Sequence, residues 1–451
     1  MDEVNKNLTY EDPKINTPFR KVKIIYADDT ASGRPCPIID EKITKELMPY
    51  YSNTHSNAYA GSLMHEKMEE SRNIIKKYYD TTDDHVVIFT GNGATGTINH
   101  LVNLINYKIH DEINIYITIF EHNSNYLPWF ELTKSYDNIK LHIIELTSDD
   151  DIDFIWLEKE LLEKKNPTIL NIISVTACSN VTGVIADISS FKKIVNKHDN
   201  TRLLFDCACL APYKRIDVSE IDALFISGHK FLGGQGTPGI LIAKKDLFQK
   251  RSPFCPGGGC VIKADQSGVE YEMDTEIKES AGTPNVSGII RLGYIYKMYN
   301  DLEKHIEKNE HYVTNYVHDE FIKICKEFPT MHVIYLDKDV NSKLPIISFS
   351  DKRYHYNFIV VLLNDLFGIQ TRGGISCCGL LGEHMKNKYN IGGWVRITFN
   401  WRMTIKEINF IISSVRTVLE NGKTFLPCYN YNEEANHWEI KQNLDLSLIK
   451  S

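Results

Sequence analysis

Short apolar runs and longer mixed stretches alternate along the first two thirds of the chain. VVIFT (86–90) and INIYITIF (113–120) are each followed by a stretch long enough for a helix. ILNIISVT, RLLFD and IDALFIS continue this arrangement, and GILIA closes the series. Apolar strands joined by helices predict a mostly parallel sheet that is covered on both faces.

The pattern changes near residue 284, where apolar residues recur at helical spacing. The span 285–328 predicts two helices. HVIYL and LPIISFS then predict strands, YNFIVVLLNDLFG a helix, VRITFN a strand and TIKEINFIISSVRTVLE a last helix. We therefore expect a second, smaller α+β unit in this part of the chain.

The length of 451 residues favours two domains over one simple core. We expect a large domain over 51–300 and a small α+β domain over 301–425. The segment 1–50 is expected to contribute to the small domain, and 426–451 to form a C-terminal tail.

Composition and charge narrow the class of protein. Hydrophobic residues make up 42% and charged residues 24%, as in ordinary soluble globular proteins. The net charge of −8 argues against nucleic-acid binding through phosphate contacts. The start MDEVNKNLTY has no secretory pattern, and no apolar run approaches the ~18 residues that span a bilayer. We expect a cytoplasmic protein with no membrane or nucleic-acid partner.

The ten cysteines contain no C-x-x-C pair and no zinc-ligand array. We expect free thiols and no metal site. Two of them flank three glycines in FCPGGGCVIK (254–263), where backbone can approach a ligand or a partner closely. We interpret this segment as a loop at the entrance of a site.

Polar side chains that could bind a ligand or take part in catalysis follow several of the predicted strands. Lys230 in ISGHKFLGG lies where an apolar strand ends and a glycine-rich loop begins, and Asp206 ends the strand LLFD. His122 and Asn180 follow two further strands, and Thr95 lies at a helix start after a glycine-rich turn. Binding groups collect at the carboxyl ends of strands in α/β proteins.

Lysine, aspartate and a phosphate cradle are the groups that pyridoxal 5′-phosphate requires. The lysine amine binds the aldehyde as a Schiff base, and a carboxylate keeps the pyridine nitrogen protonated so that the ring accepts electrons. Thr95 at the helix start, with Ser227 and His229, would bind the phosphate. His122 would lie over the ring. Each group alone is more often structural, and it is their joint order that predicts this cofactor.

These motifs resemble the class V branch of fold-type I pyridoxal-phosphate enzymes, in particular the cysteine desulfurase and selenocysteine lyase group. DDTASG, EHNSN, SNVTG, SGHK and AGTPN carry the resemblance, which runs from YADDTASG to VRITFN. It implies an α/β fold, with a mostly parallel seven-stranded sheet flanked by helices in the large domain and a smaller α+β domain beside it.

The resemblance also implies a role for each residue at these motifs. Thr283 in AGTPN would reach the phosphate of a neighbouring subunit, which implies a homodimer with shared active sites. The other implied roles are Lys230 as the Schiff-base lysine, Asp206 at the pyridine nitrogen, His122 stacked on the ring, Asn180 near the phenolic oxygen and the substrate, and Thr95, Ala94, Ser227 and His229 at the phosphate.

TRGGISCCG matches the R-x-G-x-x-C pattern of desulfurases and implies that Cys377 forms a persulfide. Arg396 would bind the substrate α-carboxylate as a planar bidentate donor, and Arg372 would help to shape the site. The implied reaction takes sulfur from L-cysteine and leaves L-alanine and an enzyme persulfide. A sulfur-acceptor protein is then a candidate partner.

Three departures from the family pattern leave questions open. Cys209 replaces a glutamine that hydrogen-bonds the phenolic oxygen, so tuning of the ring differs or passes to Asn180. Ile375 and Ser376 replace a pair of histidines that often precedes the catalytic cysteine. Cys378 follows Cys377 directly, so either thiol could be reactive, or both could be structural.

Other functions share parts of this sequence pattern. A class V aminotransferase would use the same cofactor residues but would require a keto acid as acceptor. A C–S or C–Se lyase without a persulfide would also use them, but its activity would not depend on Cys377. A non-catalytic scaffold would need neither the lysine nor the aspartate. A nicotinamide-dependent enzyme is excluded, because GNGATG lacks the third glycine at the required spacing and follows a later strand.

Overall fold

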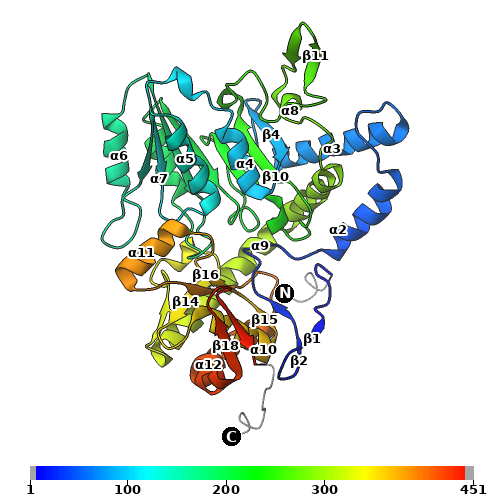
Figure 1. The fold of residues 1–451 in the computed structure, drawn as a ribbon. Helices are drawn as coiled ribbons and strands as arrows, with labels where there is room; N and C mark the ends of the chain where they lie inside the picture. Colours follow the sequence, from blue (N-terminus) through cyan, green and yellow to red (C-terminus); the bar gives the residue numbers. More distant parts are fainter. Residues whose placement is uncertain (1–6, 442–451) are drawn as a thin grey trace. The chain divides into compact units, whose positions relative to one another are not determined.

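The computed structural model describes residues 7–441, which separate into two compact units. Unit 1 holds 7–31, 180–185 and 305–441, and unit 2 holds 32–179 and 186–304. Each unit is built around its own sheet (Figure 1).

Unit 2 contains a seven-stranded sheet with the order β4-β10-β9-β8-β7-β5-β6. Strands β6, β5, β7, β8 and β9 run parallel to one another, and β10 is antiparallel to both β9 and β4. This is the predicted mostly parallel sheet. The strands are β4 (His85–Thr90), β5 (Glu112–Ile117), β6 (Ile139–Ile143), β7 (Ile169–Thr176), β8 (Thr201–Asp206), β9 (Ala223–Ser227) and β10 (Gly239–Lys244).

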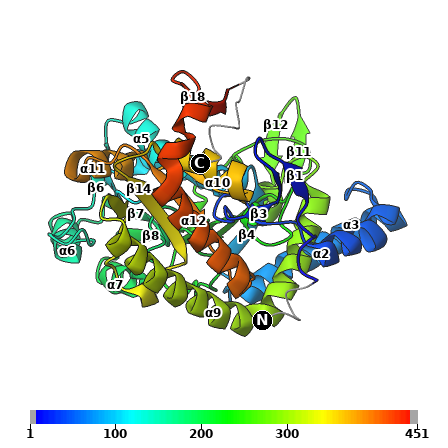
Figure 2. The same ribbon diagram turned by 90° about the horizontal axis from the view of Figure 1, so that it is seen from below.

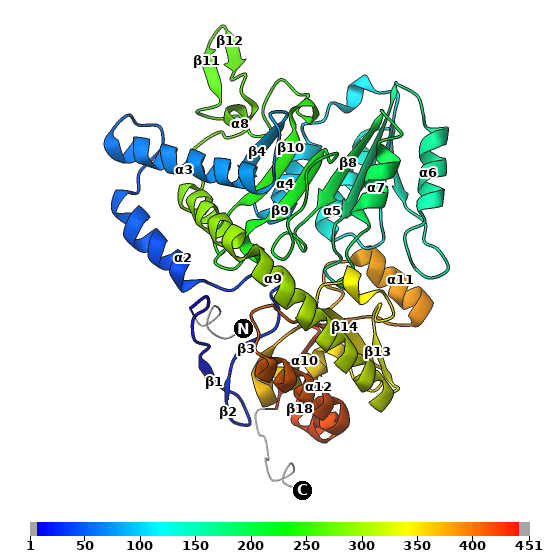
Figure 3. The same cartoon turned by 180° about the vertical axis from the view of Figure 1, so that it is seen from behind.

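Helices cover both faces of this sheet, with α4 and α5 on one face and α7 on the other (Figures 1 and 3). All five residues of β9 are buried. Because both faces are covered, the central strands are continuous apolar runs without alternation. The helices are α2 (Pro37–Lys42), α3 (Tyr59–Tyr78), α4 (Gly93–Val102), α5 (Asn123–Ser135), α6 (Phe154–Glu163), α7 (Ile188–Val195) and α8 (Thr275–Lys278).

Helix α9 (Val286–Glu327) is one continuous helix of 42 residues, and the boundary between the units falls inside it. The prediction of two helices in this span was therefore wrong. The span contains no proline, and its two glycines, Gly288 and Gly293, lie near its start. Nothing in the later part of the span interrupts the backbone hydrogen bonds.

Unit 1 is organised around a four-stranded antiparallel sheet with the order β13-β14-β17-β16. Its core joins apolar residues of the sheet to α10 and α12, which pack against each other (Figure 2). The elements are β13 (Met331–Val333), β14 (Ile346–Asp351), α10 (Tyr356–Phe367), β16 (Arg372–Gly374), α11 (Gly379–Tyr389), β17 (Trp394–Thr398) and α12 (Ile405–Phe425).

Short strands complete both units. In unit 2, a hairpin projects away from the large sheet (Figure 3). In unit 1, a second hairpin follows α12, within the segment expected to be a tail. No helix within residues 7–441 combines the length and the apolar character needed to cross a bilayer. The short strands are β1 (Lys14–Asn16), β2 (Lys21–Lys23), β3 (Ile25–Tyr26), β11 (Val261–Asp265), β12 (Gly268–Tyr271), β15 (Ile369–Gln370), β18 (Tyr429–Asn432) and β19 (His437–Ile440).

Candidate functional site

The predicted site residues fall into two groups, one in each unit. We call the residues in unit 2 the cofactor group and those in unit 1 the cysteine group. The cofactor group is Ala94, Thr95, His122, Asp206, Ser227, His229, Lys230 and Thr283, and the cysteine group is Asn180, Arg372, Cys377 and Arg396.

Three neighbouring strands of unit 2 bring most of the cofactor group to one edge of the sheet. Ser227, at the end of β9, lies opposite Gly239, which in turn lies opposite Thr90 at the end of β4. A short 3-10 turn that contains His229 and Lys230 follows β9 directly. Because α4 begins just after β4, its N-terminus reaches the same edge as the lysine.

The N-terminus of α4 forms a cradle suited to an anion. Gly93 has a left-handed φ of +60°, and a Cβ there would lie 2.7 Å from both Ser227 Oγ and His229 Cε1. The Ala94 N–H donates to Ser227 Oγ over 2.8 Å. The side chain of Asn92, the residue before the helix, does not cap this turn. The positive end of the helix therefore points its donors toward these side chains.

His229 contributes to this cradle as a neutral group. Burial lowers the pKa of His229, and the charge of Lys230 lowers it further. The imidazole would thus offer an N–H donor to a phosphate.

His122 is held by a chain of hydroxyl contacts that begins at Thr95. Thr95 Oγ1 lies 2.6 Å from Ser124 Oγ, which lies 2.9 Å from His122 Nδ1. The Ser124 N–H also donates to Nδ1 over 3.1 Å, so the imidazole caps the start of α5. Thr95 and Ser124 line a groove of about 470 Å³ between α4 and α5. These contacts fix the orientation of the imidazole beside the cradle.

Asp206 is 3% exposed at the end of β8 and accepts a hydrogen bond from the Ala208 N–H over 2.9 Å. Burial raises the pKa of Asp206, while that hydrogen bond and the nearby charge of Lys230 lower it. A buried carboxylate near a lysine is the arrangement that a protonated pyridine nitrogen requires.

Gly33, from the DDTASG motif, is a site residue whose role the sequence did not reveal. Its N–H donates to the carbonyl of His229 over 3.0 Å. A Cβ at this position would lie 2.2 Å from the carbonyl oxygen of Phe231. Only glycine lets the chain lie directly against the backbone of the Lys230 turn.

Glu121 is a second buried carboxyl that the sequence analysis did not single out. It accepts hydrogen bonds from Thr118 Oγ1 at 2.7 Å, the Thr176 N–H at 3.0 Å and Asn125 Nδ2 at 2.6 Å. Thr176 is the cross-strand neighbour of Asp206, so the two carboxyls share one region of the sheet edge. Burial raises the pKa of Glu121 to about 7, against the opposing effect of its hydrogen bonds, and Asp206 raises it further.

The raised pKa of Glu121 predicts a pH-dependent stability. The folded protein holds the Glu121 proton from about pH 4.5 to about 7, where the unfolded chain has lost it. Stability from this group therefore falls as the pH rises through that window, by at most about 1.4 kcal/mol per pH unit. We expect the melting temperature of Glu121→Gln apoprotein, relative to wild type, to rise from pH 5 to pH 7 and then level off. A difference that does not change with pH would contradict the assignment.

The cysteine group gathers at the paired strands β16 and β17 of unit 1. Arg372 and Arg396 are direct cross-strand partners, which concentrates positive charge there. Arg372 Nη2 lies 3.0 Å from Cys377 Sγ, and the cysteine is half-buried.

The two adjacent cysteines differ sharply in their surroundings. Cys378 is 0% exposed, and its thiol donates to Asn180 Oδ1 over 2.9 Å. Asn180 Nδ2 in turn donates to the Ser376 carbonyl over 3.0 Å. Ser376 and Cys377 both have left-handed φ, +54° and +58°. Cys378 and Asn180 thus hold a tight turn that presents Cys377.

Arg396 is 1% exposed and bonded within unit 1. Its Nη2 donates to Asp28 Oδ1 over 2.6 Å and its Nη1 to the Asn180 carbonyl over 3.1 Å. Within residues 7–441, its buried Nε has no hydrogen-bond partner. Asp28, from the DDTASG motif, is therefore the counter-ion of the proposed carboxylate-binding arginine, a pairing that sequence spacing cannot reveal.

The family model for aminotransferase class-V matches residues 25–411. A probable cysteine desulfurase from Borreliella burgdorferi is 30% identical over 431 residues, covering 92% of this chain and 96% of that protein. A cysteine desulfurase from Wigglesworthia glossinidia brevipalpis is 30% identical over 383 residues, covering 82% and 88%. The chain belongs to the aminotransferase class-V family, which is a family of enzymes, and the predicted membership is confirmed.

Solved structures support the fold. The apo structure of a cysteine desulfurase from Thermococcus onnurineus aligns with a TM-score of 0.77 at 23% identity, covering 88% of this chain and 95% of that one. A cysteine desulfurase from Escherichia coli aligns with a TM-score of 0.74 at 22% identity, covering 88% and 94%. The predicted fold class is confirmed.

Proposed function

We propose that the protein is a pyridoxal-phosphate-dependent cysteine desulfurase that takes sulfur from L-cysteine, leaving L-alanine and a persulfide on Cys377. The observation that carries the persulfide role is the contact of 3.0 Å between Arg372 Nη2 and Cys377 Sγ, at a cysteine with access to solvent. The curated relatives named above favour this function over an aminotransferase.

The cofactor group fits pyridoxal 5′-phosphate on three counts. The α4 cradle offers N–H donors with Ser227 and His229 for a phosphate, Asp206 offers a buried carboxylate, and Lys230 follows a strand at the same sheet edge. When bound, the cofactor supplies an electron sink for the substrate α-carbon. We propose that Lys230 binds its aldehyde, that Asp206 pairs with its pyridine nitrogen and that His122 lies over its ring.

The side chains of the protein would then bind the substrate, move its α-proton and accept its sulfur. Arg396, whose Nε has no hydrogen-bond partner in the part of the chain that the structure describes, and Arg372 would hold the substrate carboxylate. Lys230, once its amine is free, would move the proton of the α-carbon. The Cys377 thiolate would attack the substrate sulfur, so that an S–S bond forms while the carbon–sulfur bond breaks. The electron pair left on the carbon skeleton takes up a proton to give alanine.

A product assay tests this proposal. Cofactor-loaded protein is incubated with L-cysteine, L-selenocysteine and other amino acids, with and without a keto acid. We expect alanine from L-cysteine without a keto acid, and faster release of sulfide when a stronger thiol reductant than the substrate itself is added. Amino transfer that requires a keto acid, with no alanine from L-cysteine alone, would establish the aminotransferase alternative instead.

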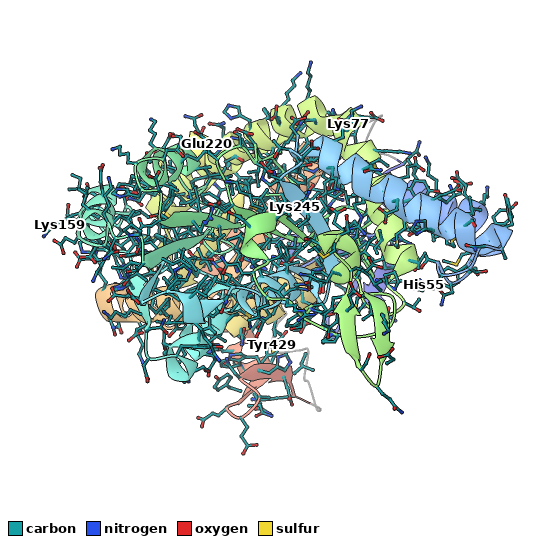
Figure 4. The ribbon with its side chains drawn as sticks, turned by 90° about the horizontal axis from the view of Figure 1, so that it is seen from above. His55, Lys77, Lys159, Glu220, Lys245 and Tyr429 are labelled. Carbon is teal, nitrogen blue, oxygen red and sulfur yellow. The ribbon has the colours of Figure 1, made fainter. Side chains whose placement is uncertain are left out.

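We further propose a homodimer with shared sites, in which Thr283 contacts the cofactor phosphate of the second subunit. Asn53 Nδ2 donates to Thr283 Oγ1 over 3.4 Å, and the Gly282 N–H donates to the Gly258 carbonyl over 2.7 Å. A Cβ at Gly259, in the same glycine-rich loop, would lie 3.1 Å from Cε1 of His55, which is labelled in Figure 4. These contacts join the loop predicted at a site entrance to the segment that carries Thr283.

Exposed apolar side chains on the same part of unit 2 support this dimer. Met273, just before α8, is 88% exposed, and Tyr59, at the start of α3, is 73% exposed. A subunit contact that covered both side chains would remove apolar surface from water, which favours association. A sulfur-acceptor protein remains a second candidate partner.

The dimer proposal predicts a specific effect of Thr283→Val. The variant keeps the shape of threonine but loses the hydroxyl, and one hydrogen bond to a charged phosphate is worth about tenfold in affinity. We expect a cofactor dissociation constant about tenfold higher, while sedimentation still shows a dimer. A wild-type protein that sediments as a monomer at all concentrations, or a Thr283→Val protein with unchanged affinity, would contradict the shared site.

A further inference from the structure

The hairpin β18–β19 lies beyond the region matched by the family model, which ends at residue 411. It docks along α10 through contacts with His355, just before the helix, and with residues near both ends of the helix. Trp438 Nε1 donates to His355 Nδ1 over 3.3 Å, and the Trp438 ring lies 4.8 Å from that of Phe358. Tyr429, labelled in Figure 4, is buried and its hydroxyl donates to Asp365 Oδ2 over 2.7 Å.

The turn of the hairpin reaches two side chains of the first turn of α10. Asn357 Nδ2 donates to the Asn436 carbonyl over 2.6 Å. Asn436 Nδ2 lies 3.0 Å from Tyr356 Oη and donates to it. Tyr356 and Asn357 are therefore held from the hairpin side by one residue.

The same two side chains press against the strands of the cysteine group. A Cβ at Gly373 in β16 would lie 2.0 Å from Asn357 Oδ1, and one at Gly393, just before β17, would lie 2.3 Å from Tyr356 Cε1. A Cβ at either glycine would have to displace these side chains, because they fill the space. Tyr356 and Asn357 thus connect the hairpin to β16 and β17.

Strand β16 determines the surroundings of Cys377. It carries Arg372, whose Nη2 contacts Cys377 Sγ, and it ends at Gly374, which has a φ of +110°. The following turn keeps Ser376 in place through its Oγ, which accepts a hydrogen bond from Trp394 Nε1 over 3.2 Å. A small shift of β16 would therefore change the distance between guanidinium and sulfur.

We propose that the C-terminal hairpin is a clamp that presses Tyr356 and Asn357 against Gly373 and Gly393 and thereby sets the Arg372–Cys377 contact. Asn436 and Trp438 are then positioning residues for the reactive thiol. The inference rests on the proposed function only in taking Cys377 as the nucleophile. The hairpin belongs to unit 1, and the contacts described above all lie within that unit.

The test compares the alkylation rate of Cys377 between the wild type and a hairpin variant, both full-length and cofactor-loaded. Alkylation is followed by the mass of the peptide that contains Cys377. The variant is Asn436→Gly combined with Trp438→Phe. Glycine keeps the left-handed φ of +48° at residue 436, and phenylalanine keeps a ring against Phe358. We expect the alkylation rate at about pH 7 to change about fivefold, because the Arg372 guanidinium then no longer donates to the sulfur.

Two comparisons separate positioning from general destabilisation. Glu439→Ala changes an exposed residue of the same hairpin and should leave the alkylation rate at the wild-type value. In an Arg372→Ala background, the hairpin variant should cause no further change, because the contact that it disturbs is already gone. A wild-type rate in the hairpin variant, or an equal change in both backgrounds, would overturn the proposal. Since no cysteine turnover is measured, a failure of the desulfurase assignment would be seen separately, as an absence of alanine.

Discussion

Asp206→Asn is expected to lower the rate of alanine release from L-cysteine on the order of 10²-fold or more, a loss typical of removing one preorganised electrostatic group. Asparagine keeps the size of the side chain and can still accept the Ala208 N–H. It carries no charge, so the protonated form of a pyridine nitrogen would lose its partner. The measurement is alanine release by the variant at saturating cofactor.

The matched control is Asp222→Asn, at a second buried aspartate of the same sheet. Asp222 accepts from Arg202 Nη1, Lys244 Nζ and the Leu203 N–H, and it belongs to no predicted site. Its replacement should lower the melting temperature and leave alanine release within a few-fold of wild type. Equal losses of rate in the two variants would show that Asp206 is structural.

Cys377→Ser is expected to lower alanine release from L-cysteine on the order of 10²-fold or more, and Cys378→Ser to change it by less than about threefold. The reason is geometric. Cys377 faces Arg372 and has access to solvent, whereas the Cys378 thiol is buried and serves as a donor to Asn180. A serine hydroxyl can replace that donor but cannot form a persulfide.

The persulfide itself gives the second measurement for this pair. After one turnover and rapid alkylation, the peptide carrying both cysteines should gain one sulfur atom in the wild type and in Cys378→Ser, but none in Cys377→Ser. A persulfide that persists in Cys377→Ser would move the nucleophile to Cys378. Unchanged alanine release in both single variants would favour a lyase that uses no enzyme thiol.

The sequence predicted the central sheet because buried parallel strands must be continuous apolar runs. It did not predict β6, whose IKLHI sequence mixes polar and apolar residues at a sheet edge. It divided α9 in two, since periodicity alone does not say whether a helix continues. It assigned no structure to β18–β19, where aromatic residues are isolated among polar ones and only tertiary contacts with α10 show their role.

Some residues of the candidate site could also be predicted from the sequence, and others could not. Lys230, Asp206 and the α4 turn could be found because strand ends and glycine-rich turns leave a local signal. The partners of Arg396 and the Lys230 turn could not, because Asp28 and Gly33 come from a distant part of the chain. Glu121 was missed for a further reason, since one acidic residue in a sequence does not reveal whether it is buried. The choice between Cys377 and Cys378 likewise needed their exposure and their hydrogen bonds.

If Lys230 binds the cofactor covalently, as proposed, borohydride reduction will make that bond permanent and allow the lysine to be identified. Cofactor-loaded protein is reduced, digested and analysed by mass spectrometry. We expect one phosphopyridoxyl group, on the peptide that contains Lys230, and no such label in Lys230→Ala. A label on another lysine, or none on a protein that has been shown to be folded, would contradict it.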